Sequence, residues 1–237
     1  MDHGTPDEIR RAVADCTRLL VHVGILDFSG HVSARIAEDR IAIIPRDMSR
    51  ATVTAEELVV VDLDDNLVEG SLPAPAEVAM HTGVYRARPD VMAVCHGHPT
   101  DSTSLTMTDR PLLPMRHFAY RHPDGVPVHP DVTHIYTREQ GDEVAATLGA
   151  GDACLIRGHG TIVVAKNVQE LFMRCLDLEE NARTLMKAEQ AGGNLLPLTA
   201  KECADIAESY GKTSHRPGKI WNHYLRMGAK AGILPEA

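Results

Sequence analysis

The 237-residue sequence lacks several features that would assign it to a common class of protein. Lys and Arg number 24 against 33 Asp and Glu, and the resulting net charge of −9 has the wrong sign for a dedicated nucleic-acid binder. No stretch approaches 18 consecutive apolar residues, so we expect no membrane span. The amino terminus lacks the cationic start and apolar stretch of a secretory signal, so we expect a cytoplasmic protein.

Cysteine is also scarce. The five cysteines are odd in number and scattered, which is unlike a disulfide framework and favours reduced, mostly buried thiols. Cys95 adjoins a histidine but should face away from it, because neighbours on a strand point to opposite faces. Composition shows no break and no internal repeat, so we expect one domain over residues 1–237.

Histidine, in contrast, is placed in a pattern. His96-Gly97-His98 ends an apolar segment typical of a strand, so both imidazoles should point to one face, roughly 6.5–7 Å apart along the backbone. His159 lies between two glycines, which permit tight backbone paths. Three imidazoles can bind one cation and leave a position open for substrate. The sequence therefore predicts one divalent metal ion per subunit on His96, His98 and His159, with zinc first and manganese or another first-row metal open.

Capping motifs and apolar spacing predict helices interspersed with paired strands. Helices are expected at about 5–23, 75–88, 99–107, 137–148 and 167–192, with another starting near 199. Strands are expected at 31–36, 40–44, 59–62, 67–69, 91–98, 153–156 and 161–165. Strands in pairs, rather than in strict alternation with helices, favour a mainly antiparallel sheet covered by helices.

Several separated segments carry a family resemblance. They are Gly30-His31-Val32-Ser33-Ala34-Arg35, Ile44-Pro45-Arg46, Leu72-Pro73 before Glu77, His96-Gly97-His98 and Arg157-Gly158-His159-Gly160. This succession resembles the class II aldolase/adducin family over about residues 9–189. The resemblance implies a three-layer α/β/α sandwich around a mostly antiparallel nine-stranded sheet, in a homotetramer with active sites between subunits. It also implies a metal, commonly zinc, on the three histidines, and a catalytic glutamate at Glu77.

Glu77 has a physical interpretation that agrees with this role. It follows Pro75 in a segment predicted as the first turn of a helix, where the helix dipole favours an ionised carboxylate. A carboxylate that faces the metal could bind it in the resting enzyme and act as a base once substrate displaces it. Without the family motif around it, an acidic residue in a first turn is more often a solvated cap.

The sequence departs from the sugar-phosphate aldolases of this family where they hold phosphate. His31 stands in place of an asparagine, Arg46-Asp47 in place of a Thr-Gly pair, and Pro75-Ala76 in place of two serines. Groups that would cradle a phosphate are therefore missing. The tyrosine that donates a proton in the sugar-phosphate aldolases corresponds to a position near His117, where this sequence has no tyrosine. The Gly-His-Val-Ser segment and residues 84–90 instead resemble the branch that decarboxylates hydroxylated aromatic acids such as hydroxy-methylpyridine-dicarboxylate and dihydroxyphthalate.

Decarboxylation of such an acid needs an electron sink, which a bound metal supplies, and cations for a second carboxylate. The planar guanidinium of arginine suits a two-point grip on a carboxylate. The candidates for substrate binding are Arg46, Arg50, Arg116 and Ser33. His31 and His117 are candidates to donate hydrogen bonds or the proton that replaces carbon dioxide. His129 and His134 are expected to be non-catalytic.

We therefore expect a divalent-metal lyase, with non-oxidative decarboxylation ahead of aldol cleavage of a non-phosphorylated or atypical hydroxy-carbonyl substrate. A metal-dependent hydrolase stays open, because residues 96–101 resemble a His-x-His-x-Asp motif with the aspartate one place too late. A non-enzymatic interaction module also stays open, because some members of the family keep the fold without the metal. A tail at about 210–237, with Trp221 and Tyr224, is a candidate for packing on a neighbouring subunit.

Overall fold

One mixed sheet of eight strands runs through residues 4–211 and 215–234, the part of the chain that the computed structural model describes. The strand order is β4-β3-β2-β1-β5-β8-β7-β6, and all neighbours are antiparallel except the parallel pair β6–β7. The strands are β1 His31–Ala37, β2 Arg40–Ile43, β3 Val59–Asp62, β4 Leu67–Glu69, β5 Ala93–Gly97, β6 Val128–His129, β7 Ala153–Ile156 and β8 Gly160–Ala165. The mostly antiparallel sheet is confirmed, with eight strands in the described residues instead of nine.

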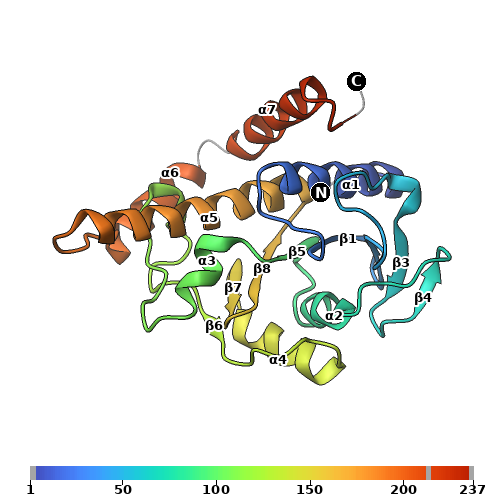
Figure 1. The fold of residues 1–237 in the computed structure, drawn as a ribbon, viewed down its shortest axis with the longest axis horizontal. Coiled ribbons are helices and arrows are strands. Elements are labelled where there is room, and N and C mark those ends of the chain that lie inside the picture. Colours follow the sequence, from blue (N-terminus) through green and yellow to red (C-terminus); the bar gives the residue numbers. More distant parts are fainter. Residues whose placement is uncertain (1–3, 212–214, 235–237) are drawn as a thin grey trace.

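Helices cover both faces of this sheet, which confirms the three-layer sandwich (Figure 1). On one face lie α1 Pro6–His22, α5 Val168–Ala191 and α7 Arg216–Lys230, and on the other lie α2 Val78–Ala87 and α4 Arg138–Leu148. Beyond them, α3 Thr100–Leu105 packs on α5, and α6 Ala200–Gly211 packs near the short helix η2 His117–Ala119. A second short helix, η1 Ala55–Glu57, precedes β3.

Alternate residues of the strands divide between two hydrophobic cores. In β5, Cys95 belongs to the core beneath α1 and α5, whereas Val94 belongs to the core beneath α2 and α4. His96 follows the parity of Val94 and therefore faces α2. The prediction that Cys95 faces away from His96 is thus confirmed, and all five cysteines are buried free thiols, as expected.

Helix starts follow the predicted caps in most places. Thr5, Thr137 and Asn167 each accept a hydrogen bond from the backbone N–H three residues on, as N-cap residues do. Helix α2 is different, because it begins at Val78 and not at residue 75. Pro75 opens a turn instead, and its carbonyl accepts a hydrogen bond from the Val78 N–H at 3.1 Å.

The carboxyl-terminal helix α7 packs on its own chain. The rings of Trp221 and Tyr224 meet Phe172 of α5 edge to face, with centroids 5.7 and 5.1 Å apart. Trp221 is buried in the core shared with α1 and α5. These aromatic residues therefore stabilise the protomer itself, and contact of the tail with a neighbouring subunit stays a prediction. Residues 212–214 and 235–237 of that tail lie outside the described residues.

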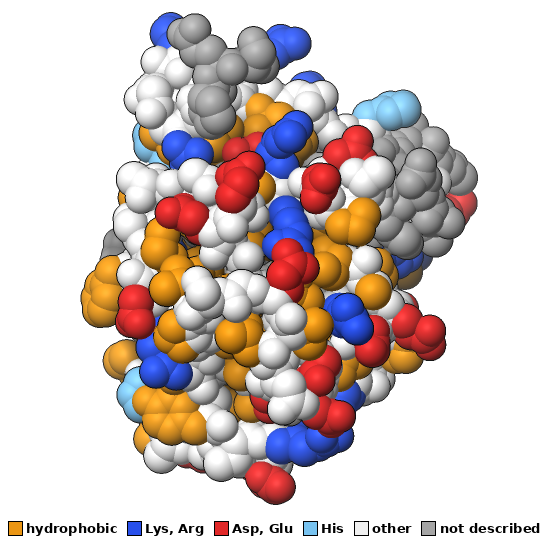
Figure 2. Space-filling view, turned by 90° about the vertical axis from the view of Figure 1, so that its right-hand side faces the viewer, with side chains coloured by type: hydrophobic (Ala, Val, Ile, Leu, Met, Phe, Trp, Pro, Cys, Tyr) orange, Lys and Arg blue, Asp and Glu red, His pale blue; other side chains and the backbone are white. Residues whose placement is uncertain are grey.

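The surface carries charges of both signs. Acidic and basic side chains are interspersed with hydrophobic ones over the face shown in Figure 2. On this face, the described residues form no continuous basic surface of the kind that follows a nucleic-acid backbone. Among the described helices, none combines the length and apolar character needed to cross a bilayer.

Helices α2 and α4 cross with their backbones in contact. A Cβ added to Gly141 of α4 would lie 2.1 Å from the carbonyl oxygen of Ala79. A Cβ added to Gly83 of α2 would lie 2.6 Å from the backbone of Gly141. Real side chains never come so close, so only glycine allows this crossing, which fixes the position of α2 on the sheet.

We expect Gly141→Ala to destabilise the protein by about 1–3 kcal/mol or more, because the added methyl group forces the two helices apart. Urea unfolding measures the loss. The matched control is Gly218→Ala in α7, where nothing lies within 4 Å of the added Cβ. Since alanine favours a helix over glycine by about 0.5–1 kcal/mol, the control should gain stability. Equal effects of the two substitutions would contradict this account of the crossing.

Candidate metal centre

Three imidazoles converge at one end of the sheet. His96 lies near the end of β5, His98 follows the same strand, and His159 lies in the turn between β7 and β8. One ligand atom from each ring lies within 4.8 Å of the others, and the Nε2 atoms of His96 and His98 are 3.1 Å apart. The structure thus brings together the three histidines that the sequence selects as metal ligands.

The outer nitrogens of two of these rings are held by oxygen atoms. Nδ1 of His96 lies 2.9 Å from the carbonyl oxygen of Thr161, and Nδ1 of His98 lies 3.0 Å from Oδ2 of Asp27. A carbonyl and a carboxylate only accept hydrogen bonds, so each Nδ1 carries the ring proton. The two Nε2 atoms therefore face each other with lone pairs, which repel unless a cation lies between them. This donor set fits a divalent metal ion.

Burial and hydrogen bonds favour a neutral His96 and an ionised Asp27. Burial lowers the pKa of His96 well below its ordinary value, so this ring stays neutral, as a metal ligand must be. Burial would raise the pKa of Asp27, but hydrogen bonds from the Ser29 backbone and from His98 outweigh it and lower this pKa to about 2. Asp27 is therefore ionised at neutral pH and orients His98.

Glycines bring the turn of His159 against the end of β5. Gly158 has a φ of +62°, a conformation that residues with a side chain rarely adopt. A Cβ at Gly160 would lie 2.3 Å from the carbonyl oxygen of Gly97, so the two backbones touch. As a result, the rings of His98 and His159 stack with centroids 5.5 Å apart. The turn and this contact therefore require the two glycines on either side of His159.

Glu77 faces the three rings from the start of α2. Its Oε2 lies 3.6 Å from Nε2 of His96, and its Oε1 lies 3.6 Å from Nε2 of His159. The backbone N–H of Ile135 donates a hydrogen bond to Oε1 at 3.0 Å. Glu77 is the N-cap residue of α2, but its side chain does not cap the helix. The buried carboxylate is therefore directed at the metal centre, where it can bind a cation or move a proton.

Comparison with known proteins identifies the family. Residues 11–186 match the family described as the Class II Aldolase and Adducin N-terminal domain. The chain belongs to this family. Class II aldolases use a divalent metal ion, which agrees with the donor set formed by the three histidines.

Curated relatives of this class II aldolase/adducin chain include two kinds of enzyme. The 3,4-dihydroxyphthalate decarboxylase of Arthrobacter keyseri is 29% identical, over 91% of this chain and 92% of the relative. The L-fuculose phosphate aldolase of Escherichia coli O6:H1 is 28% identical, over 83% of this chain and 89% of the relative. Decarboxylases and aldolases are both lyases, and this chain is an enzyme of that class.

A solved structure shows the same fold. The aldolase II superfamily protein from Pseudomonas syringae superimposes with a TM-score of 0.85, covering 97% of this chain and 95% of the other. The two sequences are 23% identical, so this likeness establishes the architecture alone.

His31 lies beside the metal centre of this family member. It is directly opposite His96 in the β1–β5 register, and its Nε2 is 4.0 Å from Oε2 of Glu77. The ring is buried, and burial lowers its pKa well below the ordinary value. His31 is therefore neutral at physiological pH, and a role at the reacting centre stays a prediction that its position supports.

A line of buried polar side chains continues from His31 beneath α2. Nδ1 of His31 is 2.7 Å from Nε2 of His81, whose Nδ1 is 2.7 Å from Oγ of Ser33. Oγ of Ser33 is in turn 3.0 Å from the hydroxyl of Tyr85. Ser33 is 0% exposed and lies beneath His81, which it supports in this chain. Contact of Ser33 with substrate stays a prediction.

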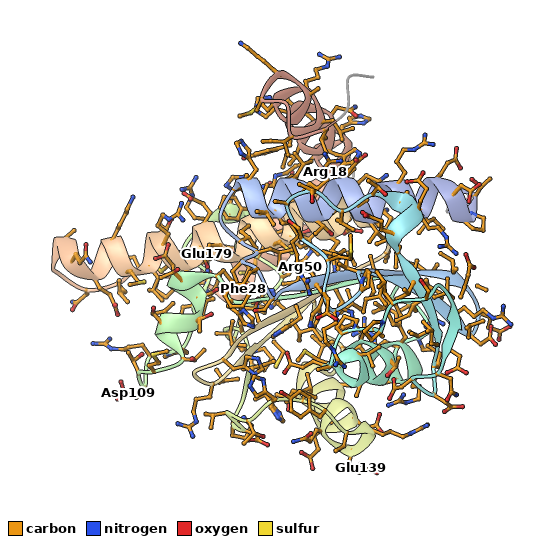
Figure 3. All side chains as sticks on the ribbon, turned by 45° about the vertical axis from the view of Figure 1, so that its right-hand side comes forward. Arg18, Phe28, Arg50, Asp109, Glu139 and Glu179 are labelled. Carbon is orange, nitrogen blue, oxygen red and sulfur yellow. The ribbon has the colours of Figure 1, made fainter. Side chains whose placement is uncertain are left out.

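Arg50 is buried next to the loop that precedes His31, and Figure 3 shows it in the interior beneath α1. Its Nε donates to the carbonyl of Gly30 at 2.9 Å, and Nη1 donates to the carbonyl of Arg46 at 2.8 Å. Arg50 therefore braces this loop, and its Nη2 makes no hydrogen bond among the described residues. Arg46 itself is exposed.

Arg116 and His117 lie away from the three histidines within the chain. Arg116 pairs with Glu180 of α5 at 3.3 Å. The ring of His117 stacks on Tyr210 of α6, with centroids 6.1 Å apart. Among the described residues these contacts place both on the α5–α6 side, so roles at an active site require the site of another subunit and stay predictions.

Two histidines join the site without having been expected there. Nδ1 of His134 is 3.5 Å from Oε1 of Glu77, and its ring meets His159 edge to face. Its side chain is 67% exposed, so it borders the open side of the site. No local pattern in its loop indicates this position. His81 could have been found, because it follows Glu77 by four residues, a spacing that places both on one side of a helix.

We expect His96→Ala to reduce bound metal from one ion per chain to near zero, because two imidazoles remain of the three. Elemental analysis of the purified, metal-equilibrated protein measures this. His22→Ala, at an exposed position at the end of α1, is the control and should keep the ion. Full metal content in the His96 variant would remove the assigned centre.

Acid should destabilise the fold through His81. Burial lowers its pKa to about 3, whereas the unfolded chain binds a proton at about pH 6.5. The stability that depends on neutral His81 is therefore complete above about pH 6.5 and declines as pH falls toward 3, by about 1.4 kcal/mol per pH unit. Urea unfolding between pH 6 and 4 should show a slope that His81→Gln makes shallower by about this amount. Identical slopes would show that His81 does not titrate in this way.

Proposed function

We propose that this chain is a divalent-metal-dependent lyase that removes carbon dioxide, without oxidation, from a hydroxylated aromatic or heteroaromatic carboxylate. The observation that carries the proposal is the contact of Nδ1 of His96 and His98 with oxygen atoms of Thr161 and Asp27, which implies that the two Nε2 atoms, 3.1 Å apart, meet with lone pairs. The relative from Arthrobacter keyseri, a 3,4-dihydroxyphthalate decarboxylase aligned over 91% of this chain, supports the choice of reaction. We propose zinc or manganese as the ion.

The reaction needs a place for electrons and a path for a proton. A bound metal would polarise the substrate hydroxyl oxygen and stabilise the negative charge that develops on it. Glu77 is placed to move the hydroxyl proton to the ring carbon that bears the carboxylate, which gives the ketone tautomer. The electrons of the breaking carbon–carbon bond then flow to the ketone oxygen as carbon dioxide leaves. A proton from water restores the hydroxyl group.

Groups near the site favour a planar acid over a sugar phosphate. His31 is a buried imidazole held by His81, and the two residues before Glu77 are a proline and an alanine without hydroxyl groups. We propose that the buried guanidinium of Arg50, whose Nε and Nη1 bind backbone carbonyls, binds a second carboxylate through Nη2. Aldol cleavage of a non-phosphorylated or atypical hydroxy-carbonyl substrate is the second candidate. It is supported by the 28% identity with the L-fuculose phosphate aldolase and by an electron sink that serves both reactions. The lyase relatives give no support to a hydrolase.

We further propose a homotetramer with active sites between subunits, as members of the family form. Arg116 and His117 support this arrangement, because they lie on the α5–α6 side of their own chain. In the tetramer they would reach the substrate bound on a neighbouring subunit. Small-angle scattering of the purified protein tests the assembly directly.

The function is tested by metal analysis coupled to detection of carbon dioxide. The substrate panel contains ortho-hydroxy aromatic acids, their analogues without the hydroxyl group, and sugar phosphates. Release of carbon dioxide from the first set alone, lost on chelation and restored by one ion per chain, is the expected result. Release of an aldehyde from a hydroxy-carbonyl compound, with no carbon dioxide from any acid, would favour the aldolase.

We expect Glu77→Gln to keep the metal and to lower kcat by about 10²–10⁴-fold, because the amide cannot carry the proton. Steady-state kinetics with elemental analysis measures both properties. Glu139→Gln is the matched control, since Glu139 is an exposed first-turn glutamate at the outer end of α4 (Figure 3). An unimpaired rate in the Glu77 variant would remove its assigned role.

A further inference from the structure

The buried row of hydrogen-bonded side chains from Tyr85 to His31 must donate its protons in one direction along the row. Tyr85, Ser33, His81 and His31 are at most 2% exposed, and each is within hydrogen-bond distance of the next. Each hydroxyl or neutral ring in such a line holds one proton, so all the protons point the same way. Two directions are possible, and they leave the far nitrogen of His31 in opposite states.

The phenol at the inner end selects between the two directions. Burial raises the pKa of Tyr85, so the phenol keeps its proton at neutral pH. Ser33 is the one side chain, among the described residues, that bonds this hydroxyl. If Ser33 donated to Tyr85, the phenol proton would be enclosed with no side-chain acceptor among the described residues, which is costly. In the other direction the last N–H is that of His31 Nε2, which faces Glu77 and the site, where substrate or water can accept it. Tyr85 therefore donates to Ser33.

The positions of the remaining protons follow from the donation by Tyr85. Ser33 then donates to Nδ1 of His81, so His81 carries its proton on Nε2 and donates it to Nδ1 of His31. Since Nδ1 of His31 accepts, its own proton lies on Nε2, the nitrogen 4.0 Å from Oε2 of Glu77. The proton position of a catalytic histidine is set in this way by the group that holds its other nitrogen.

We propose that His81, held by Ser33 and Tyr85, is a positioning residue that fixes His31 with its proton on Nε2. His31 then presents an N–H donor to the site. The reverse tautomer would offer a lone pair there, and His31, Glu77 and His96 would form a second possible donor set for the ion. The line beneath α2 thus decides whether His31 binds the metal or binds the substrate.

An N–H fixed in this position stabilises negative charge on an oxygen. Since the ring is neutral and its partner is already in place, no reorganisation is needed as charge develops on the substrate. This step rests on the proposed function, which supplies an oxygen that gains charge when the carbon–carbon bond breaks. The position of the proton does not rest on it, and the two can therefore be tested apart.

Neutron diffraction of metal-loaded crystals exchanged into heavy water tests the position of the proton. We expect deuterium on Nε2 of His31, none on its Nδ1, and deuterium on Nε2 of His81. In Tyr85→Phe, which keeps the ring and removes the selecting hydroxyl, part of the deuterium on His31 should move to Nδ1. Deuterium on Nδ1 of His31 in the wild-type protein, or a metal ion bound to His31, would overturn the proposal.

Kinetics test what the N–H does. We expect His81→Leu to lower kcat by about 10–100-fold with KM and metal content unchanged, as loss of an orienting partner does. His81→Gln, whose amide can still donate to His31, should recover part of this loss. Thr17→Val removes a buried hydroxyl in α1, far from the site, and controls for general damage to the core. A wild-type kcat in His81→Leu, or an equal loss in both His81 variants, would remove the positioning role.

The two proposals fail in different ways. If the wild-type protein turns over none of the acids, the proposed function fails, and the deuterium positions still decide the state of His31. If the protein is an active decarboxylase with deuterium on Nδ1 of His31, the function holds and the inference is wrong. Should His81→Leu not fold, Tyr85→Phe provides the kinetic comparison, with the same expected fall in kcat and the same contradicting result.

Discussion

The candidate metal centre depends on the ring protons of His96 and His98, which lie on Nδ1 of each ring. Because Thr161 and Asp27 accept hydrogen bonds from Nδ1 of His96 and His98, the two Nε2 lone pairs must face each other, an arrangement that is repulsive without a cation. The sheet supplies one of these acceptors as a backbone carbonyl of β8, and the loop before β1 supplies the other as a carboxylate. The hydrogen-bond pattern of the fold therefore favours a cation at this point, and a bound ion would relieve the repulsion between the two nitrogens.

Helix α2 connects this centre with the packing of the core. Glu77 is its N-cap residue and faces the three imidazoles, and His81, one turn further on, holds His31. The glycine crossing with α4 sets the height of the helix above the sheet. The geometry of the site therefore depends on the packing of the core. A substitution that loosens the crossing of α2 and α4 also moves the carboxylate of Glu77 and the imidazole of His81.

Local rules account for most of what the sequence predicted. Capping motifs, strand parity and the glycines around His159 depend on neighbours in the chain, so the helices, the opposed faces of β5 and the three converging rings could be foreseen. The start of α2 was misplaced, since a proline suits a turn as well as a first helical residue. The two-residue strand β6 has too few residues to show a pattern. His134 and the support of His31 by His81 arise from contacts between distant segments, which spacing alone does not reveal.

The alternation along β5 has one more consequence. Adjacent positions deliver an imidazole to one layer and a thiol to the other, where Cys95 lies in the same core as Cys16 and Cys175. A shift of this strand by one residue would exchange them, presenting a soft sulfur ligand to the cation and placing a polar ring among aliphatic side chains. Both errors are severe, so the core on one face and the histidine on the other both favour the correct register of β5. A folding intermediate with β5 shifted by one residue would form neither the core nor the metal centre.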